Sequence, residues 1–322
     1  MSDSSYATAD YRRYLAVLAT LFLVFLLSPL ALAKTDFFRR HSSYFYNAVI
    51  YDKYTLAGNN ADILFVGDSA LATGLVPSVI EQQTGWTTYN LGVPLTSFAV
   101  HRDLVIDSYL AHNSRPKIII LYLSFAAQIW HHDFDHGSLY EGAVTLLWHD
   151  NFKRNLEFYA RNPGRLFAVS ATILRSFIGG FDAHSRSWET IHKRLVADSG
   201  FLPSDALSKL PTLQPNQLNA IDVIPDKEYI AHFKSKYSKA GYFVLVSISP
   251  VAACDPSFEN VTRAYQDLVD LPPYILPCNG FTADGRSHMF RWAAEQSSFV
   301  FSKILNEALD RNQLAIPGRP RT

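Results

Sequence analysis

A chain of 322 residues is long enough to bury the core of one large domain, or of one domain with an insertion. Its 29 basic and 29 acidic side chains balance, so the protein has no basic field for nucleic acid, and we exclude that class of partner. Aromatic residues make up 14% of the chain, which a large core explains more often than a carbohydrate- or membrane-facing surface does.

The N-terminal part of the chain has two interpretations. Residues 1–13 are polar, and residues 14–33 form an uncharged stretch that is just long enough to cross a bilayer as a helix. The same stretch fits a signal peptide, because Arg12-Arg13 precede it, a Ser28-Pro29 break follows its apolar centre, and Ala31-Leu32-Ala33 end it. We therefore expect either a transmembrane helix that anchors the protein or a signal peptide that is cleaved.

Residues 34–60 are aromatic and basic, and we expect a helix or arm that links the N-terminal segment to a domain. Apolar runs then alternate with helical patterns. The expected strands span residues 61–69, 86–92, 117–123, 242–248 and 274–276, and the expected helices span residues 69–84, 97–112, 227–240, 258–270 and 288–309. Continuously apolar strands that alternate with helices indicate a parallel sheet with helices on both faces.

The sequence therefore predicts a three-layer α/β/α domain with a flavodoxin-like parallel sheet over residues 61–310, followed by a C-terminal tail at 311–322. The alternation lapses at about residues 126–225. We interpret this segment as a helical insertion or cap over the sheet, placed to shape a substrate groove.

Ser69 is the first candidate for a chemical role. It follows a short apolar run, Ile63 to Val66, and a turn at Gly67-Asp68, and the helix formers Ala70 and Leu71 come directly after it. A hydroxyl in that place lies at the carboxyl end of a strand and near the positive end of a helix dipole, where developing negative charge is stabilised. A nucleophilic serine needs such surroundings. The alternative is that Ser69 serves only as the helix N-cap.

Three blocks of this sequence together resemble the SGNH (GDSL-like) hydrolase superfamily. They are Ile63 to Ser69, Tyr89-Asn90-Leu91-Gly92 and Asp284-Gly285-Arg286-Ser287-His288. More narrowly, the chain is similar to the membrane-anchored members that esterify or de-esterify cell-surface polysaccharides. The resemblance covers roughly residues 61–125 and 240–305, and it implies an SGNH-hydrolase-like fold, a retained N-terminal anchor and no cofactor.

The resemblance makes His288 the general base that activates Ser69, and Asp284 the carboxylate partner of that base. A serine hydroxyl is a poor nucleophile until a base removes its proton, and the histidine needs a partner that holds its tautomer. The usual block is Asp-x-x-His, whereas here Asp284 and His288 are four positions apart. Either the loop absorbs the extra residue, or another group replaces Asp284, which then serves as a helix cap.

The family's oxyanion hole also includes an asparagine after the third strand, and this sequence has none between Leu121 and Gln128. Ser124 or Gln128 is the expected substitute donor, and the backbone N–H groups of Ser69 and Gly92 complete the expected hole. Asp68 and Asn90 belong to the same blocks and are further candidates for binding residues.

Histidines and carboxylates also crowd together directly after the third expected strand. They are His131, His132, Asp133, Asp135 and His136. These side chains suit zinc or manganese. Their spacing matches no established metal motif, however, so we favour a polar loop at the mouth of the site and predict no metal.

Cys254 and Cys278 are the only cysteines of the chain and flank the expected helix at 258–270. With an export-type N-terminus, two cysteines are most simply a disulfide, which would stiffen the loop that presents Asp284 and His288. Two buried free thiols in a cytosolic domain are the alternative.

These features together predict a serine esterase or O-acyltransferase that acts on acyl, for example acetyl, esters of extracytoplasmic glycans through an acyl-serine. Its expected partners are a cell-surface polysaccharide, the membrane and a membrane acyl-donor protein. The alternative function is that of a noncatalytic, membrane-anchored scaffold or glycan-binding protein with a degenerate SGNH fold, which the missing asparagine favours.

Overall fold

The computed structural model describes most of the chain. The described residues are 3–35, 45–93, 103–126, 185–202, 211–215, 218–283 and 286–312, together with the helical residues 153, 160, 167, 170, 171, 173 and 174. The predicted insertion at 126–225 is therefore described only in part.

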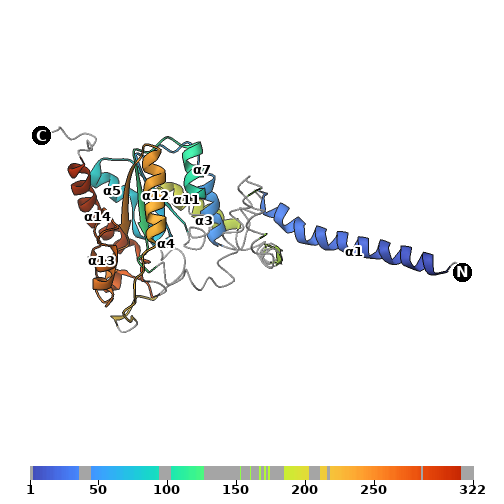
Figure 1. The fold of residues 1–322 in the computed structure, drawn as a ribbon. Helices are drawn as coiled ribbons and strands as arrows, with labels where there is room; N and C mark the ends of the chain where they lie inside the picture. The colour runs from blue at the N-terminus through green and yellow to red at the C-terminus, as the bar shows by residue number, and fades with distance from the viewer. Residues whose placement is uncertain are drawn as a thin grey trace.

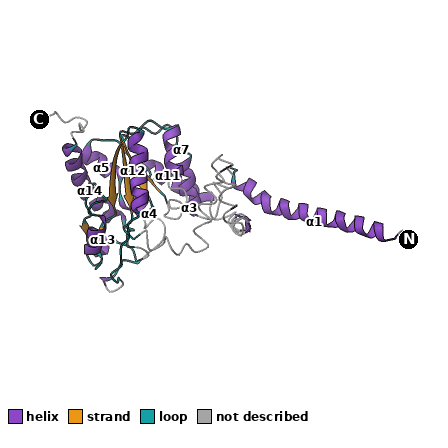
Figure 2. Cartoon of the chain, in the orientation of Figure 1, coloured by secondary structure: helices purple, strands orange, loops and turns teal. Residues whose placement is uncertain are grey.

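A central sheet of four parallel strands, in the order β2-β1-β3-β4, organises the fold (Figure 2). Its strands are β1 (Ile63–Gly67), β2 (Thr88–Gly92), β3 (Ile118–Leu123) and β4 (Phe243–Ile248). This order equals the first four positions of the flavodoxin-like order. The prediction of a parallel α/β sheet is thus confirmed, and its reason is the uninterrupted burial of β1, β2 and β3.

The N-terminal helix is α1 (Asp3–Ala33). The helices that lie around the sheet are α3 (Phe45–Tyr54), α4 (Ser69–Gly74), α5 (Pro77–Thr84), α7 (Leu104–His112), α11 (Ser185–Ala197), α12 (Lys227–Lys239), α13 (Phe258–Tyr265) and α14 (Arg291–Arg311). Figure 1 shows α5 and α14 on one side of the sheet, with α7 and α3 on the opposite side.

Alternate residues of each strand enter two separate hydrophobic cores. Phe65 and Ile120 pack with α4, α5 and α14 on one face, where the ring of Phe65 lies 5.8 Å from that of Phe301. Leu64 and Ile119 pack with α7, α12 and α13 on the other face. Because β1 and β3 are buried on both faces, their sequences are apolar rather than alternating.

The single helix expected at 69–84 is two helices, α4 and α5. They are separated at Val76, which has extended backbone angles and whose N–H donates to Ser298 Oγ at 2.7 Å. Pro77 explains the break, because a proline disfavours helical angles in the residue before it and is well placed at the start of a helix. The break turns α5 so that it can pack along α14.

The last expected strand, at 274–276, does not join the central sheet. Its residues form β6 (Ile275–Leu276), which pairs in parallel with β5 (Val251–Ala252) in a separate two-stranded sheet. A short 3-10 turn, η4 (Cys278–Gly280), follows β6 and leads into the loop that carries His288.

Residues 34–60 also differ from the expected linking arm. Within them, α3 packs against α7 and α11, and Val49, Ile50 and Lys53 are fully buried or nearly so. Helix α3 therefore packs into the domain rather than linking it to the N-terminal segment.

Residues 14–33 lie within α1, which extends away from the sheet and its covering helices (Figure 1). No helix among the described residues combines the length and the apolar character that a membrane-spanning helix needs. The expected transmembrane anchor is therefore not supported.

Residues 199–202, a described part of the predicted insertion, pack against the edge strand β2. The N–H of Asn90 in β2 donates to the carbonyl of Ser199 at 2.9 Å, and the N–H of Leu202 donates to the carbonyl of Ala72 at 2.9 Å. Gly200, with φ +89°, allows this approach, because a Cβ there would lie 2.1 Å from the carbonyl oxygen of Asn90. This segment protects the edge strand β2 from unwanted pairing.

Candidate active site

Ser69 and His288 meet at the carboxyl edge of the sheet. Nε2 of His288 lies 2.9 Å from Oγ of Ser69, although the two residues are 219 positions apart in the sequence. This is hydrogen-bond distance, and it is the geometry that a base needs to take a proton from a nucleophile. The structure therefore brings together the first two members of the expected catalytic group.

The turn between β1 and α4 places Ser69 in this position. Gly67 ends β1, and a Cβ there would lie 1.9 Å from the carbonyl oxygen of Tyr122, so only glycine fits. Asp68, rather than Ser69, caps the helix, because its Oδ1 accepts the N–H of Ala70 at 2.9 Å. The hydroxyl of Ser69 is thus not needed for capping and is directed to His288.

Asp68 is fully buried and ties the nucleophile turn to the end of β3. Its Oδ2 accepts the N–H of Ser124 at 2.9 Å. Burial raises the pKa of the Asp68 carboxyl to about 6, against the hydrogen bonds from Ser124 and Ala70 and the attraction of His288. Asp68 therefore connects the Ser69 turn to the end of β3, and its carboxylate attracts His288 when the imidazole carries a proton.

Asn90 and Gly92 make hydrogen bonds inside the protein rather than facing a substrate site. The side chain of Asn90 accepts the N–H of Gly92 at 2.9 Å and donates to the carbonyls of Leu71 at 2.8 Å and Leu75 at 2.9 Å. Asn90 therefore fixes α4 on the sheet, and the N–H of Gly92 is engaged, in contrast to its expected role in an oxyanion hole. The carbonyl of Gly92 accepts a hydrogen bond from Nζ of Lys53.

Ser124 likewise holds the site together. Its N–H binds Asp68, and its Oγ lies 2.8 Å from Oγ of Ser287 and accepts the N–H of Ala126 at 3.2 Å. Ser124 thus connects the end of β3 to the residue directly before His288. Gln128, the other expected substitute donor, lies outside the described residues.

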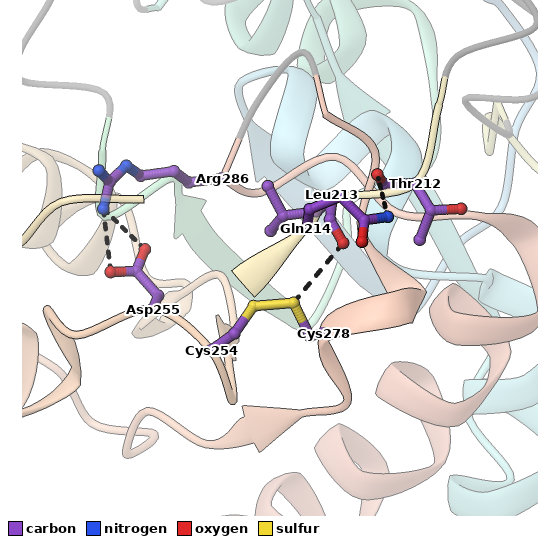
Figure 3. Close-up of a disulfide and its surroundings, with 7 residues drawn as sticks. All are labelled: Thr212, Leu213, Gln214, Cys254, Asp255, Cys278 and Arg286. Carbon is purple, nitrogen blue, oxygen red and sulfur yellow. Dashed lines mark hydrogen bonds and ion pairs between the residues drawn. A yellow bond between two sulfur atoms is a disulfide. The ribbon is translucent and has the colours of Figure 1, made fainter. Parts of the chain in front are cut away.

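The loop that carries His288 is anchored at both ends. The N–H of Thr282 donates to the carbonyl of His288 at 3.0 Å, and Phe281 and Met289 form an antiparallel bridge. Nη1 of Arg286 binds Oδ1 and Oδ2 of Asp255 at 2.9 Å each (Figure 3). The Asp255 side chain is fully buried, so this ion pair fixes the loop in a region of low solvent access.

Cys254 and Cys278 form the predicted disulfide, with Cα atoms 5.5 Å apart (Figure 3). Cys254 directly precedes Asp255, the partner of Arg286. The adjacent residues Cys254 and Asp255 therefore hold the segment before His288 at two points, Cys278 through the disulfide and Arg286 through the ion pair.

Several expected site residues lie outside the described residues. They are Asp284, Gln128 and the cluster His131, His132, Asp133, Asp135 and His136. Asp284 as the partner of His288 thus stays a prediction. Among the residues that the structure describes, no group of three or more histidine, cysteine or acidic side chains is placed to hold a metal ion.

Sequence reasoning missed two features of this site. Lys53 lies in a stretch that resembles a linker, and only its tertiary contact with Gly92 reveals its role. The Arg286–Asp255 pair had a better signal, because Arg286 stands inside the last motif block and Asp255 adjoins a cysteine.

The fold and this site define an α/β protein with a serine–histidine pair at the carboxyl edge of a parallel sheet. Comparisons with protein-family models, with characterised proteins and with solved structures found no match to this chain.

Proposed function

We propose that this protein is a serine esterase or O-acyltransferase of the SGNH type. The single observation that carries the proposal is the 2.9 Å contact between Nε2 of His288 and Oγ of Ser69 at the end of β1. A serine in hydrogen-bond contact with a histidine is what nucleophilic acyl transfer needs, and the carboxyl edge of a parallel sheet is where α/β proteins commonly bind ligands.

The reaction would proceed in two stages. His288 takes the proton of Ser69 while Oγ attacks the carbonyl carbon of an ester, and the protonated histidine then gives its proton to the departing alkoxide. This leaves an acyl-serine and an alcohol. In the second stage His288 deprotonates water or a sugar hydroxyl, which takes the acyl group and regenerates Ser69.

Asp68 would assist by charge rather than by contact with the substrate. Its buried carboxylate attracts His288 when the imidazole carries a proton, which stabilises the charged state that forms during the attack. Asp284 remains the proposed residue that holds the tautomer of His288.

We further propose that the protein works in an oxidising compartment outside the cytoplasm on acylated glycans. The Cys254–Cys278 disulfide supports the compartment, because such bonds persist in exported proteins and are rare in the cytosol. The glycan rests on the resemblance of the motif blocks to polysaccharide-modifying enzymes.

A noncatalytic binding or scaffold protein is the second candidate. It is favoured by the engagement of Gly92 N–H with Asn90, which removes one expected oxyanion donor, and by the contact of Ser124 Oγ with Ser287 Oγ at 2.8 Å, which engages the expected substitute donor inside the protein. Losing one such donor costs about 10²–10³ in rate in enzymes that depend on it.

The two candidates are separated by measuring hydrolysis of 4-nitrophenyl acetate by the purified protein and by Ser69→Ala. The esterase proposal requires turnover that the substitution abolishes without changing the circular dichroism spectrum. Turnover that survives in Ser69→Ala would show that Ser69 is not the nucleophile, whereas no turnover by the unaltered protein would favour the binding protein.

A further inference from the structure

A cavity of about 530 Å³ lies beside the first turn of α14, which begins three residues beyond His288. It is lined by Thr212, Asn279, Phe290, Arg291, Trp292 and Glu295. Its volume falls in the range of small-ligand sites, and its lining combines two aromatic rings with hydroxyl, amide and charged groups.

The cavity lies on the same side of the local backbone as His288. Phe281 and Met289 pair directly and are fully buried, so they face the core. In paired extended segments neighbouring residues extend to opposite faces. His288 and Phe290 therefore share the outer face, and Phe290 lines the cavity.

Trp292 is one of the two aromatic residues that line this cavity. It is 46% exposed, although its size would favour burial. Gly280 lies close to the start of α14, because a Cβ at that position would lie 2.7 Å from Cβ of Ala293 and 3.5 Å, an ordinary contact distance, from Cη2 of Trp292. An exposed indole beside a cavity offers an apolar face and a ring N–H to a ligand.

The charges around the cavity do not favour an anionic ligand. Nη1 and Nη2 of Arg291 each lie 3.2 Å from an oxygen of Asp198, and its Nε lies 3.1 Å from Oε1 of Glu295. One guanidinium thus faces two carboxylates, and its donors are largely used. A further negative charge, brought by a ligand, would meet more repulsion than attraction here.

We propose that this cavity binds a neutral sugar unit of an oligosaccharide, with its apolar C–H face on Trp292. The hydroxyl groups of such a ring can donate to Glu295 and exchange hydrogen bonds with Asn279 and Thr212. The interpretation of the cavity as part of a substrate site rests on the proposed function. The proposal that the cavity binds a sugar rests on its lining residues alone.

The test is isothermal titration of the full chain with maltohexaose, cellohexaose, chitohexaose and hexagalacturonate. At least one neutral oligosaccharide should bind, and Trp292→Ala should weaken that binding by about tenfold or more, the size expected for one lost aromatic contact. Asn279→Ala should weaken it as well. Phe299→Ala is the matched control, because Phe299 is an exposed aromatic of the same helix that is not among the cavity residues.

Binding by none of the neutral oligosaccharides, preference for hexagalacturonate, or equal binding by Trp292→Ala would each overturn the sugar site. The proposed catalysis is judged separately. Ser69→Ala should bind the oligosaccharide normally, and Trp292→Ala should still hydrolyse 4-nitrophenyl acetate. The titration therefore tests the sugar site and the ester assay tests the catalysis, so that one proposal can fail while the other holds.

Discussion

Nζ of Lys53 donates a hydrogen bond to the carbonyl oxygen of Gly92 at 2.5 Å, from a side chain with no exposed surface. Gly92 is the last residue of β2 and aligns with Gly67 in β1, two positions before Ser69. A buried ammonium group is thus part of the frame at the carboxyl edge of the sheet. Burial lowers the pKa of Lys53 to about 7, although the charge of Asp52 opposes this shift.

The first prediction concerns the pH dependence of stability. An unfolded lysine has a pKa near 10.4, so between about pH 7 and pH 10 the unfolded chain binds more protons at Lys53 than the folded chain does. Lys53 should therefore make the free energy of unfolding increase as the pH rises through this window. In Lys53→Met this increase should be missing. Urea unfolding of both proteins at pH 6.5, 8 and 9.5 measures the difference.

Lys117→Met is the control for that series, because the side chain of Lys117 is 60% exposed. A parallel pH dependence in the unaltered protein and in Lys53→Met would contradict a lowered pKa of Lys53.

The second prediction concerns the anchor of the His288 loop. Arg286→Met leaves the fully buried carboxylate of Asp255 without its cation, and loss of one partner of a buried pair costs about 3–5 kcal/mol of stability. The Asp255→Asn/Arg286→Met double variant should be less destabilised than Arg286→Met, because it leaves no uncompensated charge. Chemical denaturation of these proteins gives the comparison.

Lys117→Ala tests an exposed ion pair, that with Asp62, and should cost at most about 1 kcal/mol. If Arg286→Met proved no worse than this variant, the ion pair would have no role in holding the loop.

The strands of this fold were predictable, because burial on both faces demands uninterrupted apolar runs such as Ile118–Leu123. The break at Val76 was also encoded in the sequence, by Pro77, but the helical pattern on both sides of it concealed the interruption. The burial of α3 was not predictable, since residues 45–54 contain a lysine and an aspartate that only tertiary partners can accommodate.

Some residues of the candidate site could also be predicted from the sequence, and others could not. Short motifs indicated Ser69 and His288, because their chemistry depends on residue type and local turn. The roles of Asn90 and Gly92 depend on contacts with α4, so a motif alone suggested oxyanion chemistry where the structure has internal hydrogen bonds. Sequence predicts which residue types gather at such an edge better than which of their groups remain available.

The third prediction concerns the disulfide. The Cys254→Ala/Cys278→Ala double variant should lose about 3 kcal/mol of stability, because the bond closes a loop with a sequence separation of 24. It should also turn over ester more slowly, since Asp255 and the His288 loop lie beside the bond. Thermal unfolding and ester hydrolysis measure the two effects, and non-reducing peptide mapping of the unaltered protein checks that the bond forms. Two alkylatable thiols in that map would argue against an oxidising compartment.

The last prediction concerns Ser69 and His288 as one catalytic unit. Since the nucleophile depends on the base in both stages of the reaction, His288→Ala should remove ester hydrolysis almost as completely as Ser69→Ala. The double variant should then be scarcely slower than either single variant, because groups that act together have strongly non-additive effects. Asp284→Asn should retain more activity, since a residue that orients the base is easier to replace than the base itself.

The measurement is the rate of 4-nitrophenyl acetate hydrolysis by all four variants at one pH, with circular dichroism as a check on folding. Losses that multiply in the double variant would mean that Ser69 and His288 act independently. A His288 variant that keeps most of its rate would place the base elsewhere, and the histidines at 131, 132 and 136 would be the next to substitute.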